Sequence, residues 1–222
     1  MGWGHFGRQE WRRLSHARAI SKGRFGDRHD PLFLRLSEWV HPGDWVIDVG
    51  AAVGDYALEL SRLVGPDGRV IAFEPMPAQF ELLACNATLA KHANVTCLQL
   101  AVGSQPGTCR MSAPKIHGRS NWYEAAVSDD GDTTVLQIRL DDLYAERPIR
   151  LMKIDAEGHD LEVLRGAAEI IRRHQPALLV EAGGREVVDW LESLGYDRHI
   201  SAEGSANQVH LASAPRAHQP GL

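Results

Sequence analysis

The sequence predicts an α/β fold in which helices cover both faces of a mostly parallel sheet. Its 222 residues are enough for one sizeable domain, and its apolar fraction of 44% is enough for a packed core. Short apolar strands alternate with amphipathic helices, a pattern typical of βαβ units. We expect a basic helical arm over residues 1–30, one domain over 31–214 and a tail over 215–222.

The first half of the expected domain alternates regularly between strands and helices. A helix opens at Asp30-Pro31, and a His-Pro-Gly-Asp turn ends it at 41–44. The helices that follow have apolar stripes, and Pro77 suits the first turn of its helix. The predicted elements are strand 45–49, helix 54–64, strand 69–73, helix 77–92 and strand 95–102.

An insertion interrupts this alternation after the third strand. Residues 103–132 are rich in Gly, Ser, Pro and Asp and show little periodicity, so we expect a loop or lid with an extra strand at 107–112. A further strand is predicted at 133–140. The alternation then resumes with strand 150–154, helix 160–174, strand 176–181, helix 186–194 and short strands near 196–200 and 208–212.

Charge is unevenly distributed along the chain. The net charge is −5, yet residues 1–30 hold seven Arg or Lys. We favour a solvated helix over about 8–22 that packs on the domain; the alternatives are contact with a membrane, nucleic acid or an anionic substrate. No apolar run reaches the roughly 18 residues of a membrane span, and no signal segment is evident. We expect a cytoplasmic protein that binds neither nucleic acid nor membrane, with homodimer formation left open.

A glycine-rich turn follows the first predicted strand, within the run VIDVGAAVGDY from Val46 to Tyr56. Open parallel sheets bind ligands at this edge. Small residues let the backbone approach a ligand, and free N–H groups of the next helix can bind an anion. Glu74 ends the second strand, where a carboxylate can accept both ribose hydroxyls, and Pro75 and Met76 can border an adenine. The sequence therefore predicts a nucleoside site.

The turn also separates two classes of nucleoside-binding protein. The dehydrogenase fingerprint G-x-G-x-x-G is absent from it. Asp48, two residues before the first glycine, favours S-adenosylmethionine (SAM). An NAD-linked oxidoreductase is our second interpretation, and a non-catalytic nucleoside-binding module is the third.

A second polar cluster follows the predicted strand 150–154, at the same edge of the sheet. Asp155, Glu157 and His159 lie there, Asp160 follows, and Glu181 ends the next strand. Carboxylates gathered so closely repel one another unless a cation, a proton or a donor relieves them. Helix capping is an equal alternative for Asp160. The cluster predicts chemistry beside the glycine turn.

These residues together resemble the FkbM-type methyltransferases, a family of class I SAM-dependent enzymes. The resemblance covers roughly residues 44–194, and its most specific part is LMKIDAEGHDLEVLRGA. The other matching segments are VIDVGAAVGDY, IAFEP, LQLAVGS, IRLDDL and PALLVEA. The resemblance implies a Rossmann-like three-layer αβα sandwich with seven strands, the last of them antiparallel. It also implies O-methylation of a small molecule such as a sugar or secondary metabolite, with SAM as the methyl donor.

The resemblance assigns cofactor roles to individual residues. The turn would hold the methionine end of SAM, Glu74 the ribose, and Ala101 with Val102 the adenine. The family has Asn where this chain has Ala52, so we expect one side-chain hydrogen bond of the turn to be missing. The expected cofactor-binding residues are Asp48, Gly50, Ala51, Ala52, Gly54, Tyr56, Glu74, Pro75, Met76, Ala101, Val102 and Asp155.

The expected chemistry places an acceptor hydroxyl in line with the S–CH₃ bond and removes its proton. We expect Asp155, Glu157 and His159 to be the catalytic residues, and His117 is a further candidate base. A metal-assisted alternative would bind Mg²⁺ through Asp155 and Glu181, with or without Glu157. The resemblance leaves metal use open.

The insertion is expected to hold the acceptor, because it matches the family least closely. Arg119 can pair with an anionic group, and the aromatic Trp122 can stack on a ring. A polar surface loop is the alternative. The expected acceptor-binding residues are His117, Arg119, Ser120, Trp122 and Glu181.

Overall fold

The computed structural model describes residues 30–116, 119–121, 124–143, 147–181 and 184–213. The helix expected at 8–22 and the tail at 215–222 lie outside the described residues. Within the described part of the chain, no helix is long and apolar enough to cross a membrane.

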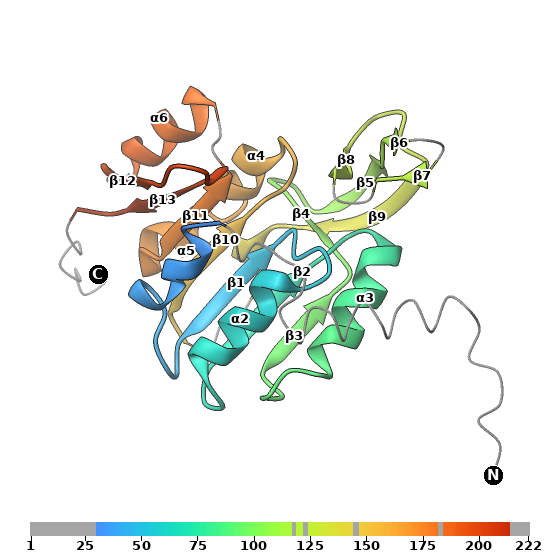
Figure 1. The fold of residues 1–222 in the computed structure, drawn as a ribbon. Coiled ribbons are helices and arrows are strands. Elements are labelled where there is room, and N and C mark those ends of the chain that lie inside the picture. The colour runs from blue at the N-terminus through green and yellow to red at the C-terminus, as the bar shows by residue number, and fades with distance from the viewer. Residues whose placement is uncertain (1–29, 117–118, 122–123, 144–146, 182–183, 214–222) are drawn as a thin grey trace, which may run out of the picture.

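A seven-stranded sheet forms the centre of the molecule (Figure 1). The last strand among the described residues runs antiparallel to both of its neighbours, and the other six strands are parallel to one another. The predicted α/β class is therefore confirmed. The strands, in their order across the sheet, are β12 (Arg198–Ser201), β13 (Asn207–Leu211), β11 (Ala177–Glu181), β10 (Ile149–Ile154), β1 (Trp45–Val49), β2 (Arg69–Phe73) and β3 (Val95–Leu98).

Helices cover both faces of this sheet and bury two apolar cores. Alternate residues of a strand point to opposite faces, so Val46 of β1 belongs to one core and Ile47 to the other. The core on the side of Val46 contains the 3₁₀ helix η1 (Phe33–Glu38), α2 (Asp55–Val64) and α3 (Pro77–Ala87). The other core contains α4 (Asp160–Arg165), α5 (Ala168–His174) and α6 (Arg185–Ser193).

The prediction of a single helix over 160–174 is wrong, because the helix is interrupted between α4 and α5. Gly166 lies against the backbone at Gly103, and a Cβ on Gly166 would be 2.0 Å from the Gly103 carbonyl oxygen. The carboxylate of Asp141, in the short 3₁₀ helix η3 (Leu140–Asp142), accepts hydrogen bonds from the backbone N–H groups of Glu169 and Ile170. These bonds stabilise the first turn of α5 as the start of a separate helix. A tertiary contact thus overrides the apolar stripe. The helix expected over 77–92 also ends early, at Ala87.

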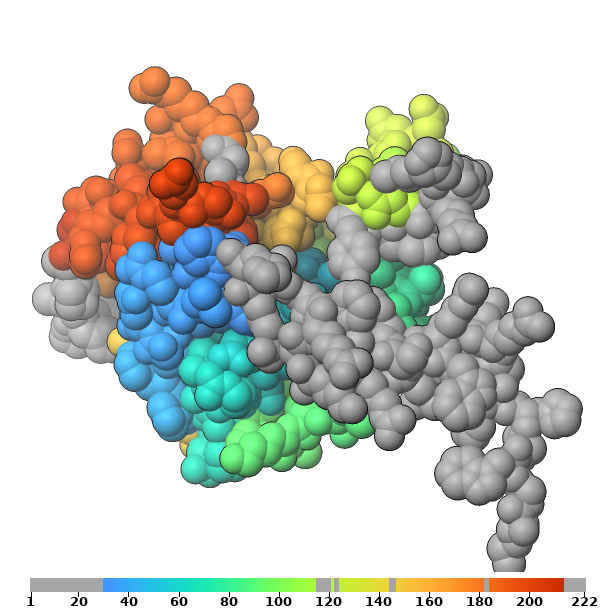
Figure 2. Space-filling model, in the orientation of Figure 1, coloured from blue at the N-terminus to red at the C-terminus, as the bar shows by residue number. Residues whose placement is uncertain are grey.

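The insertion forms a second sheet rather than an open loop. Its strand order is β4 (Ala101–Val102), β9 (Thr133–Ile138), β5 (Gly107–Ser112) and β8 (Ala126–Val127). Between β5 and β8 the chain forms a separate two-stranded sheet of β6 (Lys115–Ile116) and β7 (Arg119–Ser120). The strands expected at 107–112 and 133–140 are present. The strand expected over 95–102 is split, because its last residues pair with β9 instead of the main sheet. Figure 2 shows part of this insertion standing out from the rest of the molecule.

A pair of histidines joins β12 to β13 and predicts acid sensitivity. The Nδ1 atoms of His199 and His210 are 2.7 Å apart, and His210 is 1% exposed. Burial, with His199 nearby, lowers the pKa of His210 to about 4. The folded state therefore binds fewer protons than the unfolded state between pH 6.5 and 4, so stability falls as the pH falls.

We expect the wild type to lose about 2 kcal/mol of unfolding free energy through this group between about pH 6.5 and about pH 4.5. Urea denaturation across that range measures the loss. His210→Gln carries no titrating ring, so its stability should depend less steeply on pH. Parallel curves for wild type and variant would contradict the assignment.

Candidate functional site

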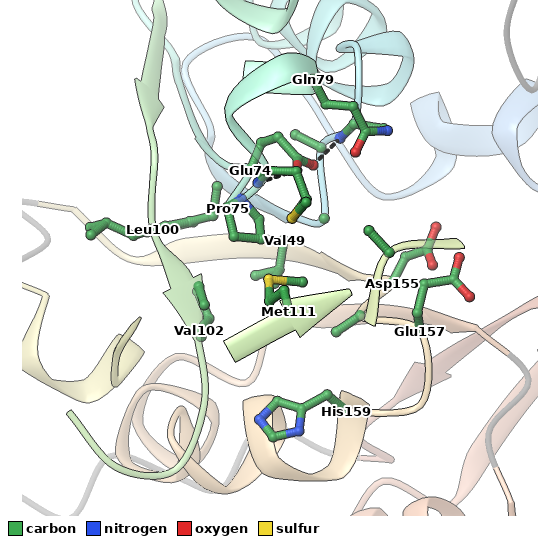
Figure 3. Close-up of a pocket in the computed structure, with 18 of the residues that line it drawn as sticks. Val49, Glu74, Pro75, Gln79, Leu100, Val102, Met111, Asp155, Glu157 and His159 are labelled. Carbon is green, nitrogen blue, oxygen red and sulfur yellow. Dashed lines mark hydrogen bonds between the residues drawn. The ribbon is translucent and has the colours of Figure 1, made fainter. Parts of the chain in front are cut away.

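A cavity of 250 Å³ lies at the carboxyl ends of β1, β2 and β10 (Figure 3). The glycine turn forms one wall, the segment after β10 another, and the insertion sheet a third. Most of the expected cofactor-binding residues line it, namely Gly50, Ala51, Ala52, Tyr56, Glu74, Pro75, Met76, Ala101, Val102 and Asp155. The sequence motifs therefore converge on one space.

The glycine turn lies closer to the backbone directly after β10 than a residue with a Cβ would allow. Gly50 has φ +70°, and a Cβ there would lie 1.8 Å from the carbonyl oxygen of Asp155. Gly54 has φ +101° and directly precedes α2, and its N–H donates to the carbonyl of Ala51. Both conformations favour glycine. The turn thus brings the start of α2 and the end of β10 to the same cavity.

Ala52 adopts a left-handed conformation that glycine or asparagine would take more readily. Its φ is +47°, and its N–H donates to Glu74 Oε2 at 2.9 Å. A Cβ in this region of the Ramachandran plot is strained, and asparagine tolerates it better than alanine. The backbone conformation gives a physical reason for the family's asparagine at this position.

We expect Ala52→Asn to raise the free energy of unfolding by about 0.5 kcal/mol, because it relieves part of that strain. Chemical denaturation measures the change. Ala90→Asn, a substitution outside the cavity, is the comparison for the residue type itself. Equal effects of the two substitutions would show that backbone strain at residue 52 does not limit stability.

Glu74 is a buried carboxylate held by the backbone on two sides. It is 4% exposed, and it accepts the N–H of Met76 at 2.8 Å and that of Ala52 at 2.9 Å, the two dashed bonds in Figure 3. Burial raises its pKa to about 7, against the lowering effect of these two donors. Each carboxylate oxygen can accept a further bond, so Glu74 can still bind a diol.

Lys153 is a functional candidate that the sequence motifs did not single out. It is 3% exposed, and its Nζ donates to the Gly50 carbonyl oxygen at 2.8 Å. The same atom lies 3.1 Å from Asp155 Oδ2 and 3.7 Å from Asp48 Oδ1. Asp48 is fully buried and lies beneath the cavity rather than in its lining. The signal for Lys153 in the sequence was a lysine within the apolar run LMKI.

Carboxylates crowd the wall that follows β10. Burial, followed by the charges of Asp155 and Glu181, raises the pKa of Glu157 to about 7. Burial and Asp155 likewise raise the pKa of Glu181, which does not line the cavity itself. Asp160 accepts the N–H of Ala156 at 2.9 Å and so shapes this loop. Among the described residues, no group of three or more His, Cys, Asp or Glu is placed to hold a metal ion.

His159 borders the cavity but does not face the carboxylates. Figure 3 shows its ring directed away from the side chains of Asp155 and Glu157. Its Nε2 is buried and has no hydrogen-bond partner among the residues that the structure describes. His159 therefore lies at a different part of the lining from the acidic cluster.

The insertion contributes apolar side chains to the cavity, which the sequence did not predict. Met111 of β5, with Ala125 and Val127 at β8, lines it together with Leu100. Of the expected acceptor residues, Arg119 and Ser120 lie in β7, whose side chains are not described. His117 and Trp122 lie outside the described residues.

Comparisons with known proteins agree with this geometry. A family model described as the methyltransferase FkbM domain matches residues 48–198. Methyltransferase sdnD of Sordaria araneosa is 28% identical over 211 residues, which cover 78% of this chain and 81% of the relative. The 31-O-demethyl-FK506 methyltransferase FkbM of Streptomyces tacrolimicus is 31% identical over 172 residues, which cover 63% of this chain and 65% of the relative.

A solved structure shows the same fold. The FkbM methyltransferase of Methylobacillus flagellatus KT has a TM-score of 0.54 at 17% identity, covering 93% of this chain and 60% of that chain. The Rossmann-like arrangement of the sheet is thereby confirmed. Because the family model spans more than half of the 222 residues, the chain belongs to the FkbM methyltransferase domain family.

Proposed function

We propose that this protein is a SAM-dependent O-methyltransferase that acts on a hydroxyl of a small molecule. The observation that carries the proposal is the cavity shared by the glycine turn, Glu74 and the carboxylates after β10. The relative from Streptomyces tacrolimicus is named as an O-demethyl-FK506 methyltransferase. That name supports oxygen as the acceptor atom.

The residues around the cavity fit SAM in their chemistry. Gly50 lets the turn lie against the backbone after β10, where a Cβ would be 1.8 Å from the Asp155 carbonyl oxygen, and the N–H groups at the start of α2 suit the methionine carboxylate. Glu74 suits the ribose diol, and the apolar Met76 and Val102 suit the faces of an adenine. SAM, when bound, supplies an activated methyl group on a sulfonium.

In this proposal the protein's own part is to orient the acceptor and to take its proton. As the acceptor oxygen takes the methyl group that bound SAM would supply, its hydroxyl proton would pass to Glu157. A base works best when its pKa is near the working pH, and the raised pKa of Glu157 meets this condition. The apolar wall from the insertion supports an acceptor with an apolar portion.

Calorimetric titration with SAM, S-adenosylhomocysteine and NAD tests the cofactor. We expect SAM and S-adenosylhomocysteine to bind and NAD not to bind. Methyl transfer is then measured as S-adenosylhomocysteine release against a panel of alcohols, carboxylates and amines. NAD binding without SAM binding would reject the proposal, and SAM binding without transfer to any alcohol would reject O-methylation.

Glu74→Gln should weaken SAM binding about 10- to 100-fold, because a hydrogen bond to a charged group contributes more than one to a neutral amide.

SAM binding by the wild type should also strengthen as the pH rises from about 6 to about 8. The hydroxyl donors favour the ionised carboxylate, whose pKa in the free protein is about 7, so binding releases a proton. Titrations in buffers of different ionisation enthalpy measure that release; its absence would contradict ribose binding by Glu74.

A further inference from the structure

The ammonium group of Lys153 lies directly beneath the glycine turn. Lys153 belongs to β10, and its Nζ donates to the carbonyl oxygen of Gly50 at 2.8 Å. The same Nζ lies 3.1 Å from Oδ2 of Asp155, whose side chain is 35% exposed and reaches the cavity. One cation therefore contacts both the turn and the acidic wall.

Two further groups hold the ammonium in this place. The buried Asp48 has Oδ1 3.7 Å from Nζ, and the centroid of the Tyr56 ring lies 5.3 Å from it. The Tyr56 hydroxyl donates to Asp30 at 3.3 Å, and Asn207 donates to the same Asp30 oxygen at 2.9 Å. Contacts from Asp30, which precedes η1, and from β13 thus fix the ring against which the cation packs.

Burying a lysine is costly unless its charge is compensated on several sides. The shortest contacts of Nζ are with the Gly50 carbonyl oxygen at 2.8 Å and with Asp155 Oδ2 at 3.1 Å, whereas Asp48 Oδ1 is 3.7 Å away. Gly50 and Asp155 lie on the two sides of the cavity where the turn meets the segment after β10. The charge of Lys153 is therefore compensated mainly by residues of the site.

We propose that Lys153 is a positioning residue that holds the glycine turn and the Asp155 carboxylate in the mutual arrangement that binds SAM. This inference rests on the proposed function, because it assigns to one buried side chain the coupling between two walls of the SAM cavity. Lys153, which also lines the cavity, acts through its contacts with Gly50 and Asp155.

A double-mutant cycle tests this coupling, with the dissociation constant of SAM as the readout. Lys153→Met should weaken SAM binding at least about 10-fold, because both walls lose their common contact. Asp155→Asn should also weaken it. In Lys153→Met the carboxylate is no longer held, so adding Asp155→Asn should change affinity by less than about 3-fold. Lys91→Met, at an exposed lysine, is the matched control and should bind SAM as the wild type does.

The outcomes separate the inference from the proposed function. If the wild type binds SAM and the two substitutions act independently, the positioning role is rejected and the proposed function stands. If the wild type does not bind SAM, the proposed function itself fails. Circular dichroism checks folding. If Lys153→Met does not fold, the cycle is repeated with both substitutions made in the Asp48→Asn variant. This variant lacks the buried charge that Lys153 faces, and the inference requires the same non-additivity there.

Discussion

Gly50→Ala is expected to lower the free energy of unfolding by about 4 kcal/mol and to abolish SAM binding, through two additive causes. The φ of +70° strains any residue that has a Cβ, and that Cβ would lie 1.8 Å from the Asp155 carbonyl oxygen. The carbonyl belongs to the backbone and cannot rotate away, so the turn must separate from the end of β10. Chemical denaturation and calorimetry with SAM measure the two losses.

Gly43→Ala is the matched control for this prediction. Gly43 also has a positive φ, +90°, but a Cβ added to it would have no described atom within 4 Å beyond its chain neighbours. It should therefore lose only about 1 kcal/mol, the cost of the conformation itself, and bind SAM normally. Equal losses in the two variants would show that backbone strain, and not the close approach of the turn to β10, sets the requirement for glycine.

The location of the site was predictable because strand ends were predictable. The runs that end at Val49, Phe73 and Ile154 are short, apolar and followed by small or acidic residues, so the sequence placed their carboxyl ends correctly. Parallel strands present those ends at one edge, whatever their exact register. The residues that follow them, including Glu74 and Asp155, therefore had to lie near one another.

The role of Lys153 depended on information that periodicity does not contain. Lys153 and Asp48 are register partners on β10 and β1, strands that lie far apart in the chain. A shift of one residue in that register would turn the lysine to the opposite face. From the sequence alone, Lys153 was one polar residue in an apolar strand, and its partners could not be identified.

The strands at 107–112 and 133–140 were predicted, but the rest of the insertion sheet was missed for a different reason. Two of its strands, β4 and β8, have only two residues each, too few to show an alternating pattern. The β4 strand also pairs with β9, which comes much later in the chain, so no local signal marks it. Composition correctly marked a departure from the helix–strand alternation there, but it could not distinguish a loop from paired short strands.

Glu157→Gln is expected to lower kcat about 100-fold or more, with whichever alcohol the transfer panel identifies, because the amide cannot take a proton. The pH profile gives the sharper test. A general base must be deprotonated, so the wild-type rate should rise with pH and level off above about 7, the pKa to which burial and the neighbouring carboxylates raise Glu157. Glu157→Gln should lose this rise along with the rate.

Glu181→Gln tests the cause of that raised pKa. The charge of Glu181 contributes to raising the pKa of Glu157, so removing it should move the rising limb to lower pH. Glu59→Gln, on α2, where the carboxylate pairs with Arg62 and does not line the cavity, should leave the limb in place. A limb that does not move in Glu181→Gln, or a rate that survives in Glu157→Gln, would transfer the role of base to another residue, and His159, which lines the cavity apart from the carboxylates, would be the next to substitute.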